Sequence, residues 1–179
     1  MLPDDAVDRI AEGCRTIGAM CTSQGIEQWE VVATQSYGHS IDIEAGKISL
    51  AAGGGEGGYG VRVVEGGRFG YAYLVDLSSA EYAIKQARDI AKASPSIEGF
   101  VLPSEQSAKE VGGLFDSNIL SVGPEDLLEQ ADAILSEVAS LDQRAVVTGG
   151  GLGVSANAGA IYTSEGIESS GVTTSHGVG

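Results

Sequence analysis

The stretch from Gly58 to Ala93 constrains the fold most, because it predicts a tight β-hairpin that runs directly into a helix. Apolar and aromatic residues alternate over 58–65 and again over 68–75, the pattern of two half-buried strands. Gly66 and Gly67 lie between these runs, where a short hairpin turn requires positive φ angles. We therefore expect an antiparallel hairpin followed by a helix over 79–94 that stops before Pro95.

A candidate cap precedes this helix. Ser78 is followed three residues later by Glu81, the spacing of a capping box, and Leu77 and Tyr82 have the spacing of a hydrophobic staple. On this hypothesis, Ser78→Ala lowers the free energy of unfolding by about 0.5–2 kcal/mol.

The rest of the chain predicts two more helices and further strands. One helix is expected over 4–23, and another begins at Pro124, a residue favoured at the first helical position. Period-two patterns predict strands near 29–37, 38–45, 47–53, 58–65, 68–75, 145–149, 152–157, 159–163 and 167–175. Prolines and glycines make 95–123 an irregular connecting segment. The predicted fold class is α+β, with glycine-rich antiparallel β-meanders and helices packed on one side.

Composition excludes some functions. The net charge is −15, from 25 acidic and 10 basic residues, and the basic residues are scattered, so we expect no direct binding of nucleic acid. No apolar run reaches the length of a membrane span, and the N-terminus lacks the apolar core of a signal peptide. We expect a cytoplasmic protein that does not enter a membrane.

Candidate chemical motifs are weak. Gly55–Gly60 satisfies G-x-G-x-x-G, but a strand and not a helix follows it, so a turn or bulge is favoured over a dinucleotide site. His39 and His176 are the 2 histidines; neither has zinc-ligand spacing, and His39 is expected at the surface. Ser40 and Asp42 follow His39 too closely to form a hydrolase triad with it.

Three further residues favour structural interpretations over functional ones. Arg62 is interpreted as an exposed strand residue paired with Glu65 or with an acid on a neighbouring strand, and contact with a peptide or a second domain is the alternative. Cys14 and Cys21 lie roughly 10 Å apart along the predicted helix, which is too far for a disulfide. We interpret both as small buried residues.

The hairpin and helix resemble the N-terminal domain of the TldD/PmbA family. That family has a strand ending in G-x-G-V-R-V, a turn, "G-x-A-x-x-x-D-L" and a helix with alanine at every fourth position. A later turn resembles the family's "V-x-x-S-x-G-x-x" segment. The matching residues are Gly58, Gly60, Val61, Arg62, Val63, Gly70, Ala72, Asp76, Leu77, Ala83, Ala87 and Ala91, and, in the later turn, Ile161, Ser164, Gly166 and Ile167.

The resemblance implies a domain of a zinc metalloprotease system, also named for modulation of DNA gyrase, that processes or degrades peptides. Its active members carry an H-E-x-x-x-H helix, which this chain lacks, so no catalytic, cofactor-binding or metal residue is assigned to it. Whether the chain belongs to an enzyme stays open. We interpret 1–179 as an N-terminal framework domain, a fragment without the C-terminal domain.

The same resemblance implies partners. They are a TldD/PmbA-type subunit in a homo- or hetero-oligomer and a peptide substrate, with zinc held by the full-length parent or its partner. The alternative is a stand-alone binding or scaffolding module without peptidase activity.

Overall fold

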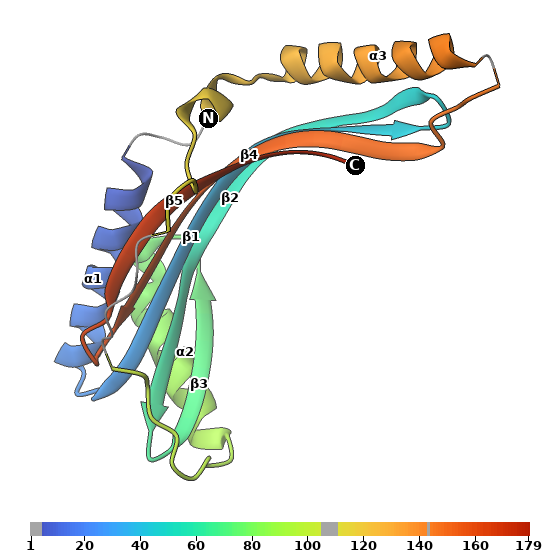
Figure 1. Ribbon diagram of the computed structural model, residues 1–179. Coiled ribbons are helices and arrows are strands. Elements are labelled where there is room, and N and C mark those ends of the chain that lie inside the picture. Colours follow the sequence, from blue (N-terminus) through green and yellow to red (C-terminus); the bar gives the residue numbers. More distant parts are fainter. Residues whose placement is uncertain (1–4, 105–110, 143) are drawn as a thin grey trace.

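The computed structural model describes residues 5–104, 111–142 and 144–179. Five strands form one antiparallel sheet in the order β3-β2-β1-β4-β5, with three α-helices on one of its sides (Figure 1). The elements along the chain are α1 (Ala6–Ser23), β1 (Gln28–Glu44), β2 (Lys47–Glu65), β3 (Arg68–Leu74), the 3₁₀ turn η1 (Leu77–Ser79), α2 (Ala80–Ala93), the 3₁₀ turn η2 (Ser117–Ser121), α3 (Pro124–Leu141), β4 (Gly149–Thr163) and β5 (Glu168–Val178).

The α+β class is confirmed, and the two predicted meanders are halves of a single sheet. The meander β1-β2-β3 comes first in the chain, and the hairpin β4-β5 joins it when β4 pairs with the free side of β1. The predicted hairpin turn is confirmed as well, since Gly66 and Gly67 have φ angles of 59° and 71°.

The predicted strand boundaries are wrong in the glycine-rich stretches. The segments 29–37 and 38–45 form one strand, β1, and the predicted break between 53 and 58 lies within β2. Glycine lowers the intrinsic preference for a strand, but neighbouring strands pair through the backbone and hold these residues extended. Residues 145–148 are not a strand. Two of their carbonyl groups accept from the β1-β2 turn: Val147 accepts from Gly46, and Thr148 accepts from Ala45.

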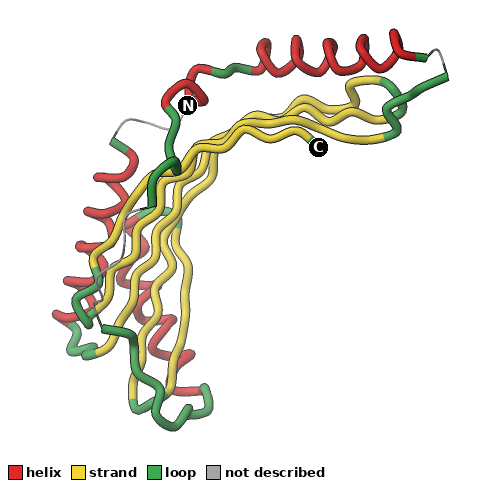
Figure 2. The backbone as a smooth tube through the Cα atoms, viewed as in Figure 1, coloured by secondary structure: helices red, strands yellow, loops and turns green. Residues whose placement is uncertain are grey.

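The long strands continue through two halves of the molecule, and the sheet bends between them (Figure 2). In one half, α1 and α2 cover the sheet and enclose the larger core, which includes Ile17, Ile84, Val31, Val61 and Val63. In the other half, α3 contributes Leu127 and Ala131 to a smaller core with Ile41, Ile43, Leu152 and Val154. We call this second half, residues 38–44, 47–56, 149–155 and 175–178 of the strands, the far arm.

Alternation along β1 defines the two faces of the sheet. Val31, Ala33, Ile41 and Ile43 are buried on the side of the helices, which we call the helix face. The even-numbered residues of β1, from Val32 to Glu44, lie on the opposite side, and no helix of the described chain packs there. This side, the open face, carries many glycines and small polar residues.

The predicted cap of α2 is wrong. The helix begins at Ala80 behind a 3₁₀ turn, and the capping side chain is Asp76, whose Oδ1 accepts from the N–H of Ser78 at 2.8 Å. Leu77 and Tyr82 are 39% and 65% exposed, so they do not form a buried staple. Asp is as good a cap as Ser, and it occurs two residues earlier, so the first turn forms there.

The cysteines and the third helix agree with expectation. Cys14 and Cys21 are free and fully buried on α1. Pro124 is the first residue of α3, and the carboxylate of Asp126 accepts from the N–H of Gly123 at 2.7 Å. Among the described helices, none combines the length and the apolar character needed to cross a bilayer.

Candidate functional site

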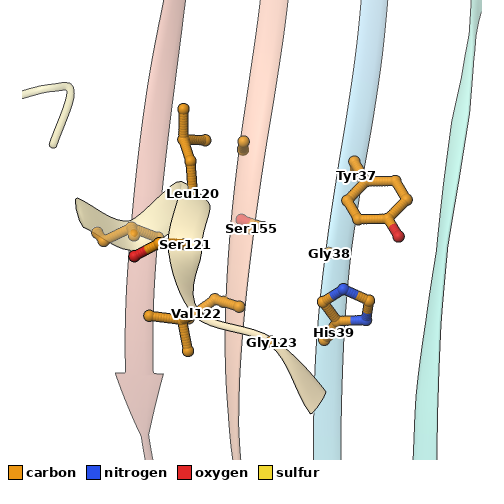
Figure 3. A pocket seen from close by; sticks show the side chains of 11 residues that line it. Tyr37, Gly38, His39, Leu120, Ser121, Val122, Gly123 and Ser155 are labelled. Atoms are coloured by element: carbon orange, nitrogen blue, oxygen red, sulfur yellow. The ribbon is translucent and has the colours of Figure 1, made fainter. Parts of the chain in front are cut away.

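A cavity of about 210 Å³ lies on the helix face, over β1 and β4. Its floor is formed by Tyr37, Gly38 and His39 of β1 with residues 154–156 of β4 (Figure 3). Its cover is the segment 119–123, which includes most of η2. The lining is mainly apolar. Among the described residues that line it, the ionisable groups are the imidazole of His39 and the phenol of Tyr37.

The cover of this cavity is held to the edge strand β5. The N–H of Thr174 donates to the carbonyl of Leu114 at 2.9 Å, and its hydroxyl accepts from the N–H of Asp116 at 2.8 Å. Asp116 also caps η2, because its Oδ1 accepts from the N–H of Asn118 at 2.9 Å. The irregular connection is therefore anchored at 114–118 before it crosses the sheet.

His39 is half-buried in this cavity, which corrects the expectation that it lies at the surface. Its ring meets the ring of Tyr37 edge-on, with the centroids 5.2 Å apart. Gly53 is its partner on β2, and a Cβ at Gly53 would collide with Nδ1 of His39. The imidazole of His39 therefore occupies the space that a side chain at Gly53 would fill.

The strand register brings the two histidines onto one row of the sheet. His39 pairs with Val154, and Val154 pairs with His176, so both histidines lie on the helix face with one strand between them. His176 is engaged with α3, since its Nε2 lies 3.1 Å from Oε1 of Gln130. Within the described chain, no group of three or more His, Cys, Asp or Glu residues is arranged to hold a metal, so these residues do not fit a zinc site.

The other candidate motifs do not form reactive sites. Ser40 and Asp42 lie on the open face, opposite His39, so the three side chains do not converge. Gly55–Gly60 lies within β2 and does not open a helix, as a dinucleotide fingerprint must. Arg62 forms a cross-strand ion pair with Glu30 at 3.2 Å, which confirms the structural interpretation, while Glu65 pairs with Arg88 at 2.8 Å.

The open face is the candidate functional surface that the sequence patterns missed. Tyr71 and Tyr73 of β3 are 52% and 56% exposed, and their hydroxyl ends lie over Gly60 and Gly58 of β2. Next to them, a shallow hollow of about 600 Å³ runs over β1, β4 and β5, with residues such as Thr34, Asn157 and Gly171 along it. A signal was present, since tyrosines alternate at 71 and 73 and glycines alternate at 58 and 60. Which tyrosine covers which glycine depends on the register of the two strands.

Comparison with known proteins agrees with this architecture. Residues 29–91, which cover most of β1, all of β2 and β3 and most of α2, match the family model described as PmbA/TldA metallopeptidase domain 1. This part of the chain is therefore similar to the first domain of that family.

Solved structures from this family share the fold of the domain. TldE from Thermococcus kodakarensis superposes with a TM-score of 0.83 and 21% identity, covering 92% of this chain and 37% of that protein. A protein assigned as a modulator of DNA gyrase from Bacteroides thetaiotaomicron also reaches a TM-score of 0.83, with 20% identity over 99% of this chain and 41% of its own.

A sequence relative comes from Methanocaldococcus jannaschii. It is 29% identical over 139 residues, which make up 78% of this chain and 32% of the relative. The present chain therefore spans about a third of that relative and about two fifths of the matching solved structures.

Proposed function

We propose that this TldD/PmbA-type domain is the non-catalytic framework of a metalloprotease-family subunit that takes part in peptide processing or proteolysis. The observation that carries the proposal is the match of 29–91 to domain 1 of a metallopeptidase family, located on the strands that build the open face. In this proposal the chain works in the cytoplasm, in an oligomer with a TldD/PmbA-type subunit. Zinc and the catalytic residues belong to the longer parent or to the partner.

The open face supports a role in guiding an extended peptide. Glycines and small polar residues on β1, β4 and β5 leave backbone accessible along the shallow hollow, and tyrosines of β3 border the same face. Ser155 and Ser175 hydrogen-bond across β4 and β5 at 2.9 Å, and Asn157 donates to Ser155 at 3.2 Å. This surface offers hydroxyl and amide groups in a shallow hollow to an extended peptide lying across it.

The test is reconstitution of peptide digestion. The chain alone, dialysed and then supplied with zinc, is expected to leave unfolded casein and fluorogenic peptides intact. Addition of a TldD-type subunit that contains an H-E-x-x-x-H helix is expected to give digestion, and replacement of the glutamate in that helix is expected to abolish it. Digestion by this chain alone that survives chelators would contradict the framework role.

The alternative is a stand-alone binding or scaffolding module. Reading the gene beyond Gly179 separates the two. Continuation into an H-E-x-x-x-H helix supports a protease subunit, continuation without one supports a partner subunit, and an immediate stop codon supports the scaffold.

A further inference from the structure

β2 extends well beyond its outer neighbour. β3 pairs with Tyr59–Glu65 of β2, while 47–58 pair with β1 on one side only. In the described parts of the chain, no strand pairs with the other side of 47–58, and the side chains over 49–56 are exposed. Leu50, for example, is 54% exposed.

A strand edge of this kind can pair with another chain. Unpaired N–H and C=O groups can recruit a further strand, and proteins prevent this with proline, charged side chains, β-bulges or a covering element. The run 47–58 contains no proline, and glycine occupies 53–55 and 57–58, so few side chains obstruct an approaching backbone. We propose that residues 47–56 of β2 pair antiparallel with the same residues of a second copy of this chain, which joins two five-stranded sheets into one.

An irregularity in β2 sets the register of this pairing. Asp42 pairs with Leu50, but Ile43 pairs with Ile48, so Ser49 is an extra residue in the strand. It changes the alternation, which brings Lys47 to the same face as Leu50 and Glu56, the open face, and Ile48 to the helix face. In a two-fold pairing centred on Ala52, residues facing one another must lie on the same side of the sheet.

With Ser49 unpaired, this same-face requirement determines which residues of the two copies face one another, and their charges and sizes are complementary. Lys47 of one copy faces Glu56 of the other, and the symmetry forms this pair twice. The large residues face glycines, because Leu50 lies opposite Gly54 and Ile48 lies opposite Gly55. Neither Lys47 nor Glu56 has an ion-pair partner within the described chain, so both charges are available to a second copy.

The pairing ends before the elements that neighbour β2. Beyond Glu56, Gly57 and Gly58 are bordered by Val75, which follows β3, and by Arg9 of α1, so the second copy pairs with 47–56 only. This inference gives a surface to the oligomer proposed above and rests on that part of the proposal. It does not depend on the peptidase role.

Sedimentation velocity over a range of concentrations tests the pairing through charge reversal. The unmodified chain is expected to dimerise, and Lys47→Glu and Glu56→Lys are each expected to raise the dissociation constant about tenfold or more, because each change creates two like-charge pairs. Mixing the two variants in equal amounts is expected to restore dimers, since each Lys47→Glu chain then faces a Glu56→Lys chain. The variant with both changes is expected to dimerise with itself.

Matched controls carry the same charge changes elsewhere. Lys85→Glu on α2 and Glu98→Lys in the following loop are exposed sites away from β2 and are expected to leave the dissociation constant unchanged. Thermal melts check that each variant folds. A monomer at every concentration would overturn the proposal, as would a dimer that neither charge reversal weakens or that mixing does not restore. Peptide digestion by the reconstituted system tests the framework role separately, because the pairing can fail while digestion still occurs.

Discussion

Single residues determine how α2 begins and how closely it packs against the sheet. Asp76 starts the turn that leads into α2, and Gly70 lets that helix approach β3 more closely than any side chain would permit. A Cβ at Gly70 would overlap the carbonyl oxygen of Ala87, which belongs to helix backbone and cannot move aside easily. Both residues match the family pattern, and the structure explains why each position requires its residue type.

Replacing Asp76 is expected to destabilise the protein more than replacing Ser78. Hydrogen bonds donated by Ser78 hold the pKa of Asp76 below its usual value, so the ionised carboxylate is the capping form. Its contribution is present above the unfolded-state pKa and is lost as the pH falls through the lower folded-state pKa. Thermal melts of Asp76→Ala and Ser78→Ala at neutral pH should show a larger drop in Tm for the first, because only that change removes the capping oxygen, and the drop should shrink in acid. Equal drops would favour the capping box at Ser78.

Gly70→Ala is expected to lower the free energy of unfolding by about 1–3 kcal/mol, because the added methyl group forces α2 and β3 apart. Gly159→Ala is the matched control, since nothing lies within 4 Å of a Cβ there. In that extended position alanine should be neutral or stabilising by up to about 1 kcal/mol. Urea unfolding curves of the two variants measure the difference, and equal midpoints would contradict the close approach.

At the scale of elements, the connection between α2 and α3 is held by β5. Thr174 makes backbone and side-chain hydrogen bonds to Leu114 and Asp116, and these position the segment that covers the cavity beside His39. The sequence predicts only an irregular segment over 95–123, and residues 105–110 of it lie outside the described structure.

Thr174→Val preserves the shape of the side chain but removes its hydrogen bonds with Asp116. The expected cost is about 0.5–1.5 kcal/mol per lost bond. Hydrogen exchange should become faster in 114–121 while the strands β1 and β4 keep their protection. Thr173→Val, on the opposite face of β5, is the control and should leave this segment unchanged. Uniformly faster exchange would mean that the segment is not anchored separately.

Local patterns predicted the elements that local forces decide. The hairpin at Gly66 and Gly67, the apolar face of α1 and the start of α3 at Pro124 all depend on neighbours in sequence, and all are confirmed. The length of β1 and β2 could not be predicted from local patterns. Residues such as Gly53 are extended because they pair with the neighbouring strand β1, and not because of their own preference. The cavity at His39 depends on a segment some 80 residues away in the chain, for which no spacing gives a signal.

At the scale of the whole molecule, Cys14 and Cys21 of α1 are buried in the larger core between this helix and the sheet. Burial raises the pKa of the Cys14 thiol to about 11 and that of the Cys21 thiol to about 12, although Arg15 and Arg88 respectively oppose these shifts. Both thiols are therefore protonated and unreactive in the folded chain at neutral pH.

A thiol reagent such as DTNB is expected to react with neither cysteine in the folded chain at pH 8 and with both in denaturant. Because folding raises both pKa values, the stabilisation is complete below the unfolded value of 9.0 and is lost as the pH rises toward 11 to 12. Chemical unfolding across this range, compared with the variant carrying Cys14→Ala and Cys21→Ala, isolates the thiol contribution. Parallel pH profiles for the two proteins would contradict it.

The central position of β1 has a consequence for how the chain is made. One side of β1 pairs with β2 within the same hairpin, but its other side pairs with β4, and Glu30 meets Thr163 there. During synthesis on the ribosome, the meander and α2 can form while that second side is still unpaired, because β4 emerges much later. A nascent chain of this domain therefore exposes an open edge from the time the meander forms until β4 emerges. We expect that interval to be the period in which it depends most on molecular chaperones.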